Sequence, residues 1–140
     1  MGLYNSKNLK TAKRTCDRWF NKYIRIRDAD THGKINCITC GREYDWDNCN
    51  AGHWIEASIL PTRYHPHNVN AQCVHCNLSD NGFASWHGKE IALKYGKEIP
   101  DELIEISKSD KSYDKEQVMA LARQFKTLAE ELAEEKGIGL

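Results

Sequence analysis

The sequence is poor in apolar residues and contains no long hydrophobic run. Its 140 residues are 40% hydrophobic and 29% charged, with a mean hydropathy of -0.71. No stretch approaches the roughly 18 apolar residues that a membrane-spanning helix needs, so we expect no membrane partner. The first 27 residues are charged throughout and lack the apolar segment of a secretory signal, which predicts a cytoplasmic protein. The length fits one domain with a core of its own.

The sequence also lacks a net charge, because 20 basic residues balance 20 acidic ones. The two signs are nevertheless segregated along the chain. Up to Arg27 there are eight basic residues and one acid, and from Glu98 onward there are eleven acids and six basic residues. Such asymmetry favours a face that meets a polyanion. Two ordinary solvated helix faces are the alternative.

Four of the six cysteines form two Cys-x-x-Cys pairs. Thiols stay reduced in the cytosol, and the two-residue spacing lets both sulfurs of a pair reach one ion. No thioredoxin-like βαβ pattern accompanies the pairs, so redox motifs are disfavoured. We predict a closed, structural Zn²⁺ site whose ligands are Cys37, Cys40, Cys73 and Cys76. Cys49 is a conceivable ligand as well, but we interpret Cys16 and Cys49 as small buried residues.

Apolar periodicity and helix end signals predict four longer elements. We expect helices over 6–28 with Ser6 as N-cap, over 86–95 before Gly96, from Pro100 to Ser107, and between Asp114 and Gly137. Residues 35–50 predict short strands, and a short helix is expected from Cys76. Pro61 and Pro66 predict an irregular loop over 55–67.

Apolar residues of the last helix recur at steps of three and four. This seam consists of Val118, Leu121, Phe125, Leu128 and Leu132. Packing against the first helix is the simpler interpretation. A homodimer seam is the alternative.

Three polar residues are interleaved with the cysteine pairs in the order His53, Asn68, Asn77. This order resembles the HNH (ββα-metal) nucleases, whose pattern is a Cys-x-x-Cys, a strand-ending His, an Asn in the returning loop, and a second Cys-x-x-Cys followed by His or Asn. The resemblance covers residues 37–77. It implies an α+β fold, a zinc-stabilised ββα-metal core with flanking N- and C-terminal helices.

The resemblance extends to the NinG/Rap family of phage recombination nucleases, and more distantly to phage endonuclease VII. The shared features are the Arg-rich first helix, Cys-Ile-x-Cys-Gly, Ala-Gly-His plus an aromatic residue, Arg63-Tyr64, and the block from Asn68 to Asn77. It implies structure-specific cleavage of branched DNA, such as Holliday junctions and D-loops, inside a bacterial host. We expect one nuclease domain over 1–140, with a basic helix (1–30), the core (35–85) and a helical tail (86–140).

The resemblance implies a role for each polar residue. Hydrolysis of a phosphodiester needs an activated water and a cation near the leaving oxygen. His53 is implied as the general base, because an imidazole titrates near neutral pH. Asn77 is implied as a ligand of Mg²⁺ or Mn²⁺, and Asn68 as the brace of the loop that orients His53. The zinc does no chemistry.

One position departs from the pattern, because many HNH proteins place a metal ligand before the base, where this chain has Gly52. We consider Asn50 first as the replacement ligand, then Glu56, then His53 itself. The predicted DNA contacts are Lys10, Lys13, Arg14, Arg18 and Arg63, with a surface salt bridge as the alternative for Arg63. A non-catalytic zinc-containing DNA-binding module, and a nicking HNH endonuclease acting on linear duplex, are the competing functions.

Overall fold

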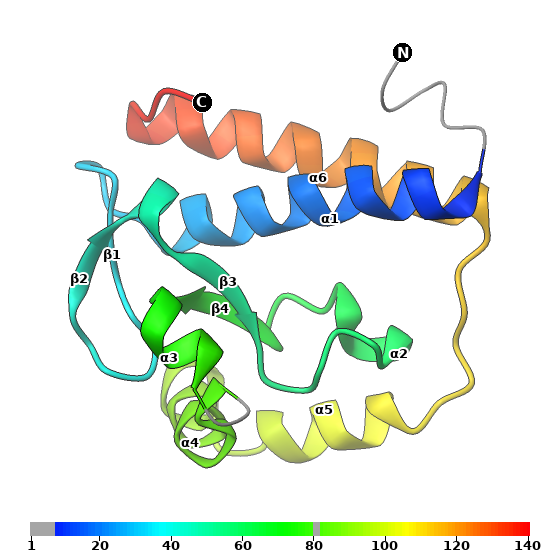
Figure 1. Cartoon of the computed structure of the whole chain (residues 1–140), viewed down its shortest axis with the longest axis horizontal. Coiled ribbons are helices and arrows are strands. Elements are labelled where there is room, and N and C mark those ends of the chain that lie inside the picture. Colours follow the sequence, from blue (N-terminus) through cyan, green and yellow to red (C-terminus); the bar gives the residue numbers. More distant parts are fainter. Residues whose placement is uncertain (1–7, 80–81) are drawn as a thin grey trace.

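The structure, a computed structural model, describes residues 8–79 and 82–140 and mixes helices with two small sheets, as predicted (Figure 1). The long helices are α1 (Leu9–Asp28) and α6 (Lys115–Lys136). Between them lie β1 (Lys34–Asn36), β2 (Glu43–Asp45), the short turn η2 (Trp46–Asn48), β3 (Asn50–His53), α2 (Leu60–Arg63), β4 (Val69–Gln72), α3 (Val74–Leu78), α4 (Ala84–Tyr95) and α5 (Ile99–Ser107). Within the described ranges, no helix has the length and apolarity to cross a membrane.

Helices α1 and α6 pack side by side and run in the same direction (Figure 1). The predicted seam of α6 lies in this contact: Val118 and Phe125 are buried, and the ring centroid of Phe125 is 4.8 Å from that of Phe20 on α1. The simpler interpretation of the seam is therefore confirmed. Because the two helices are parallel, the chain between them must return along their length, and β1 to α5 form that return.

The N-terminal ends of both long helices are capped by side chains. The Oδ1 atom of Asn8 accepts the N–H of Thr11 at the start of α1. The predicted cap Ser6 lies outside the described residues. Asp114 and Gln117 form a reciprocal capping box on α6, which ends at Gly137 with a φ of 71°, as its glycine predicts.

Two antiparallel pairs, β1 with β2 and β3 with β4, make up the sheets. In the second pair, Gly52 lies opposite Asn70 and His53 lies opposite Val69. Since side chains alternate along a strand, Ala51 and His53 face one side and Gly52 the other. Ala51 and Val69 pack against α1, so the opposite face of the hairpin is turned toward α3 and α4.

Side chains from the end of α1 cover the outer edge of β4. The carboxylate of Asp28 accepts the N–H of Ala71 at 2.8 Å, and the guanidinium of Arg27 donates to the carbonyl of Val69 at 3.0 Å. The same carboxylate is paired with Arg27 and with Lys94 from α4. These contacts satisfy backbone groups that a third strand would otherwise pair.

We predict that Asp28→Asn lowers the free energy of unfolding by about 3 kcal/mol, because Arg27 and Lys94 would lose their buried counter-charge. Burial opposes ionisation of Asp28, but the hydrogen bonds and charges of Arg27 and Lys94 outweigh it and lower its pKa. The contribution is therefore present at neutral pH and is lost as the pH falls through the lowered pKa. Urea unfolding at several pH values measures it. Asp110→Asn, at an exposed carboxylate, is the control.

Two local predictions were wrong, and both errors have physical reasons. Residues 55–67 contain a helical turn, α2, because Pro61 sits in its first turn, where a missing N–H costs nothing. Helix α3 starts at Val74 rather than at Cys76, because the sulfur of Cys73 caps it by accepting the N–H of Cys76. The predicted helices ending at Tyr95 and at Ser107 are confirmed.

Candidate metal centre and candidate active site

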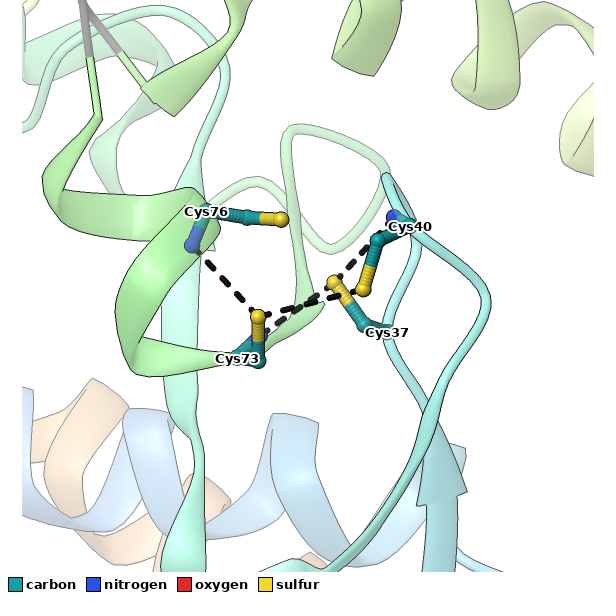
Figure 2. A group of neighbouring side chains, drawn as sticks. All are labelled: Cys37, Cys40, Cys73 and Cys76. Atoms are coloured by element: carbon teal, nitrogen blue, oxygen red, sulfur yellow. Dashed lines mark hydrogen bonds between the residues drawn. The ribbon is translucent and has the colours of Figure 1, made fainter.

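The four predicted zinc ligands meet at one point (Figure 2). Cys37 and Cys40 come from the turn after β1, and Cys73 and Cys76 come from the start of α3. Their four sulfur atoms lie within 4.8 Å of one another, which suits the sulfur ligands of one tetrahedral ion. The group can therefore hold a metal ion such as zinc. Cys49 is buried elsewhere and donates its S–H to the carbonyl of Trp46.

The surroundings of Cys37 favour its thiolate. Burial opposes ionisation, but the N–H of Cys73, the hydroxyl of Thr39 and the N–H of Cys40 all point at its sulfur and lower its pKa. A thiolate is the form of cysteine that binds metal. The N–H of Cys73, which belongs to the second Cys-x-x-Cys pair, thus favours the metal-binding thiolate of Cys37 in the first pair.

The candidate active-site residues lie on a hairpin followed by a helix. His53 is the last residue of β3, Asn68 directly precedes β4, and Asn77 lies on α3. Asn77 is held next to the four-cysteine group, since Cys76 precedes it and its N–H bonds to the carbonyl of Cys73 at 2.9 Å. The hairpin–helix succession therefore brings all three polar residues into one region of the molecule.

The ring of His53 is half-buried, and among the described residues its hydrogen-bond partner is the carbonyl of Arg63. Its Nε2–H donates to the carbonyl of Arg63 at 2.9 Å, since a carbonyl can only accept. The other ring nitrogen, Nδ1, then carries the lone pair of the neutral imidazole. Burial and the charge of Arg63 lower the pKa of His53, while the hydrogen bond to Arg63 and the charge of Asp17 oppose them. At neutral pH the ring is therefore uncharged and able to accept a proton.

Asn68 is fully buried and uses its amide at both ends of the loop that follows His53. Its Oδ1 accepts the N–H of Ile55 at 2.8 Å. Its Nδ2 donates to the carbonyls of Ile55, at 3.0 Å, and Thr62, at 3.1 Å. These bonds fix the segment up to Thr62, and the next residue, Arg63, supplies the carbonyl that holds the His53 ring. The role of Asn68 in orienting His53 stays a prediction, and these bonds are the contacts through which it would act.

Two amide oxygens meet at Gly52, the residue before His53. A Cβ atom at position 52 would collide with Oε1 of Gln72 and would lie 3.1 Å from Oδ1 of Asn77. Asn50, the first replacement ligand considered, shares this face of β3 because it lies two residues away. Glu56 lies exposed in the loop after β3. The roles predicted for Asn50 and Glu56 remain predictions.

The ring of His53 and the amide of Asn77 belong to opposite faces of β3, because residues 52 and 53 are adjacent on the strand. The His53 ring centroid is 6.3 Å from that of Phe20 on α1. The two groups could therefore meet at a shared phosphate beyond the end of the strand, whereas a cation held by Asn77 would lie on the Gly52 side of the hairpin. His53 is the last residue of β3, which is where such a phosphate would have to bind.

Arg63 adopts the salt bridge that was its alternative interpretation. Its guanidinium donates to both carboxylate oxygens of Asp17 on α1, at 2.6 Å and 3.1 Å, and to the carbonyl of Ala57. Asp17 also accepts the hydroxyl of Tyr64 at 2.6 Å. These contacts tie α2 and the His53 partner carbonyl to α1. A phosphate contact by Arg63 remains a prediction.

The predicted basic contacts lie on α1. Lys10 and Arg14 are exposed and Lys13 is half-buried. Lys10 precedes Asp17 by seven residues, Lys13 by four and Arg14 by three, so these three basic residues share the side of the helix that carries Asp17. Arg18 is exposed one residue further on. The basic side of α1 therefore runs toward the Asp17–Arg63 contact beside His53.

Sequence reasoning missed two buried polar residues near this site, Gln72 and His87. The signal for Gln72 was the alternation of Asn68, Asn70 and Gln72 along a strand, which predicts polar groups on one face. His87 lies on α4, where burial, and then the charges of His53 and Lys94, lower its pKa to about 4. The sequence carries no comparable signal for His87.

Comparisons with known proteins identify relatives in bacteriophages. The family model described as bacteriophage Lambda NinG protein matches residues 3–135. Protein ninG of Escherichia phage lambda and protein ninG of Escherichia phage 933W are each 34% identical over 86 residues, which cover 59% of this chain and 39% of each relative. The chain thus spans well under half the length of these curated relatives.

No solved structure matches the chain. The family assignment therefore depends on the sequence matches, of which the family model extends over nearly all of the 140 residues. The chain belongs to the NinG family.

Proposed function

We propose that this chain is a metal-dependent endonuclease that cuts branched DNA formed during recombination, such as four-way junctions and D-loops. The observation that carries the proposal is the hairpin–helix arrangement of β3, β4 and α3. It places His53 at a strand end, Asn68 in the returning segment and Asn77 beside the cysteine site. This is the order and placement that the resemblance to HNH nucleases implies.

His53 is the proposed general base. Its Nε2–H is held by the carbonyl of Arg63, so the free lone pair of Nδ1 can take a proton from an attacking water. The lowered pKa keeps the ring neutral at the pH of a cell. Asn68 acts as a positioning residue, because its bonds to Ile55 and Thr62 fix the segment that carries the Arg63 carbonyl.

Asn77 would hold the catalytic cation through its amide oxygen, the kind of ligand that Mg²⁺ and Mn²⁺ prefer. When bound, such a cation supplies positive charge at the scissile phosphate and at the leaving oxygen. The oxygen of Asn77 faces the same point as that of Gln72, and both are acceptors. These two amide oxygens are therefore suitable ligands for a hard divalent cation.

We predict that neutralising the basic side of α1 weakens DNA binding and flattens its dependence on salt. The change is a variant with glutamine at Lys10, Lys13, Arg14 and Arg18. Each phosphate contact that is lost should reduce the slope of log affinity against log salt by about 0.9. Fluorescence anisotropy of a labelled junction at several salt concentrations measures the slope. The control carries glutamine at Lys89, Lys97, Lys108 and Lys111, and an unchanged slope in the α1 variant would place the DNA elsewhere.

The proposed activity is tested by incubating the zinc-loaded protein with a synthetic four-way junction and with a linear duplex of the same sequence. Each reaction contains Mg²⁺, Mn²⁺ or EDTA, and products are separated on a denaturing gel. We expect cuts near the branch point of the junction, dependent on the cation and absent from the linear duplex. Equal cutting of both substrates would instead indicate a nicking HNH endonuclease.

One observation favours a second candidate function, a non-catalytic zinc-containing DNA-binding module. Gly52 carries no side chain where many HNH proteins have a metal ligand, and a Cβ atom there would collide with Gln72. A module of this kind would bind the junction in the same assay but would leave it intact under all three conditions.

A further inference from the structure

The space beside Gly52 is occupied by the side chain of Gln72. Gln72 ends β4 and is completely buried, with 0% of its surface exposed. Its Oε1 lies so close to Gly52 that a Cβ atom at position 52 would overlap it. Only glycine at position 52 therefore permits this placement of the Gln72 oxygen.

The orientation of the Gln72 amide is determined by its nitrogen. Nε2 donates to the carbonyl of Gly82 at 2.9 Å and to Oγ1 of Thr39 at 3.1 Å. Because the Gly82 carbonyl can only accept, the nitrogen must face it and the oxygen must face Gly52 and Asn77. Thr39 in turn lies 3.2 Å from the sulfur of Cys37 and can donate its hydroxyl proton to a thiolate there. A zinc-bound Cys37 would thus orient the Gln72 oxygen through Thr39.

The oxygen itself has no donor among the residues that the structure describes. A buried polar atom without a partner costs about 1–3 kcal/mol. Oδ1 of Asn77, a second acceptor, lies 3.1 Å from the same Cβ position beside Gly52. With the Asn77 amide in this orientation both oxygens are acceptors, so a cation or its bound water would satisfy both and would hold the Asn77 oxygen toward Gln72.

We propose that Oε1 of Gln72 is the second protein ligand of the catalytic cation, replacing the side chain that Gly52 lacks. This inference rests on the proposed function, which places the cation at Asn77. It assigns the compensating ligand to β4 rather than to Asn50 on β3 or Glu56 in the following loop. It also gives the structural zinc a second task, the orientation of the Gln72 amide through Thr39.

The test measures Mn²⁺ binding by the electron paramagnetic resonance signal of free Mn²⁺, with zinc-loaded protein alone and with a four-way junction, after subtraction of junction alone. Gln72→Met keeps the length of the side chain but removes the oxygen. We expect it to weaken Mn²⁺ binding by about 10–100-fold, as does Asn77→Ala. Gln124→Met, at an exposed glutamine of α6, should bind Mn²⁺ like the wild type.

A second variant covers the case in which Gln72→Met does not fold. Gln72→Glu keeps an oxygen at this place and adds a negative charge. Mn²⁺ should therefore bind this variant at least as tightly as it binds the wild type. Mn²⁺ should also raise the melting temperature of Gln72→Glu by more than it raises that of the wild type. Wild-type Mn²⁺ binding that is lost in Asn77→Ala but retained in folded Gln72→Met overturns the assignment of Gln72 alone. A melting temperature of Gln72→Glu that Mn²⁺ leaves unchanged overturns that assignment as well. A wild type that binds no Mn²⁺ in either sample overturns the cation site, and the proposed function with it.

Discussion

Cys73→Ser is expected to lose zinc and folded protein together. Structural zinc contributes on the order of 10–16 kcal/mol in small zinc-binding peptides, whereas a whole domain is typically stable by only about 5–15 kcal/mol. The site joins the turn after β1 to the start of α3, and the same turn donates the N–H of Ile38 to the carbonyl of Ala71 on β4. Without the ion, the segments between the two long helices lose the link that holds them in register.

The expected result is a chain without bound zinc, with reduced helical circular dichroism and no cooperative unfolding transition. Metal analysis and thermal melts of the purified protein measure it, and prolonged chelation of the wild type should reproduce it. Cys49→Ser is the matched control, because Cys49 is also buried but bonds to Trp46 rather than to the cysteine group. A Cys73→Ser protein that melts like the wild type would show that the site contributes little to stability.

The features predicted correctly from the sequence are those with local causes. The spacing within each Cys-x-x-Cys pair positions two sulfurs without help from the rest of the fold, so the four-cysteine group could be predicted. Helix α6 begins after Asp114 and ends at Gly137, and both boundaries could be predicted because capping depends only on the nearest turn of the helix. The apolar seam of α6 could likewise be predicted, because its residues are spaced by three and four along the helix itself.

The features that were missed depend on segments distant in sequence. Nothing local to Asp28 indicates that its carboxylate pairs with an N–H of β4, 43 residues later. The wrong start of α3 has a related cause, because Cys73 of the four-cysteine group takes the place of the usual capping residue. The collision between Gln72 and a side chain at position 52 depends on the register of β3 with β4 and on the Gly82 contact. The departure at Gly52 could therefore be seen in the sequence, but its compensation could not.

His53→Ala is expected to keep the fold and to lower the rate of junction cleavage by about 10²–10⁴-fold, the usual contribution of a general base. The ring lies at the end of β3, and truncation leaves the Arg63 carbonyl without its donor, a cost of about 1–3 kcal/mol. The fold should tolerate this loss, because Asn68 and the Asp17–Arg63 pair still hold the loop. Single-turnover cleavage in Mn²⁺ measures the rate, with junction affinity and melting temperature recorded on the same samples.

The dependence of the rate on pH separates a base from a merely structural histidine. Burial lowers the pKa of His53, so its neutral form prevails above the ordinary value of about 6.5 and for some distance below it. The wild-type rate should therefore fall only as the pH drops below that value, and the residual rate of His53→Ala should lack this step. His32→Ala, at an exposed histidine, should retain both the rate and the step. Full activity in folded His53→Ala would remove this imidazole from the mechanism and leave Asn77 and the cation to activate the water.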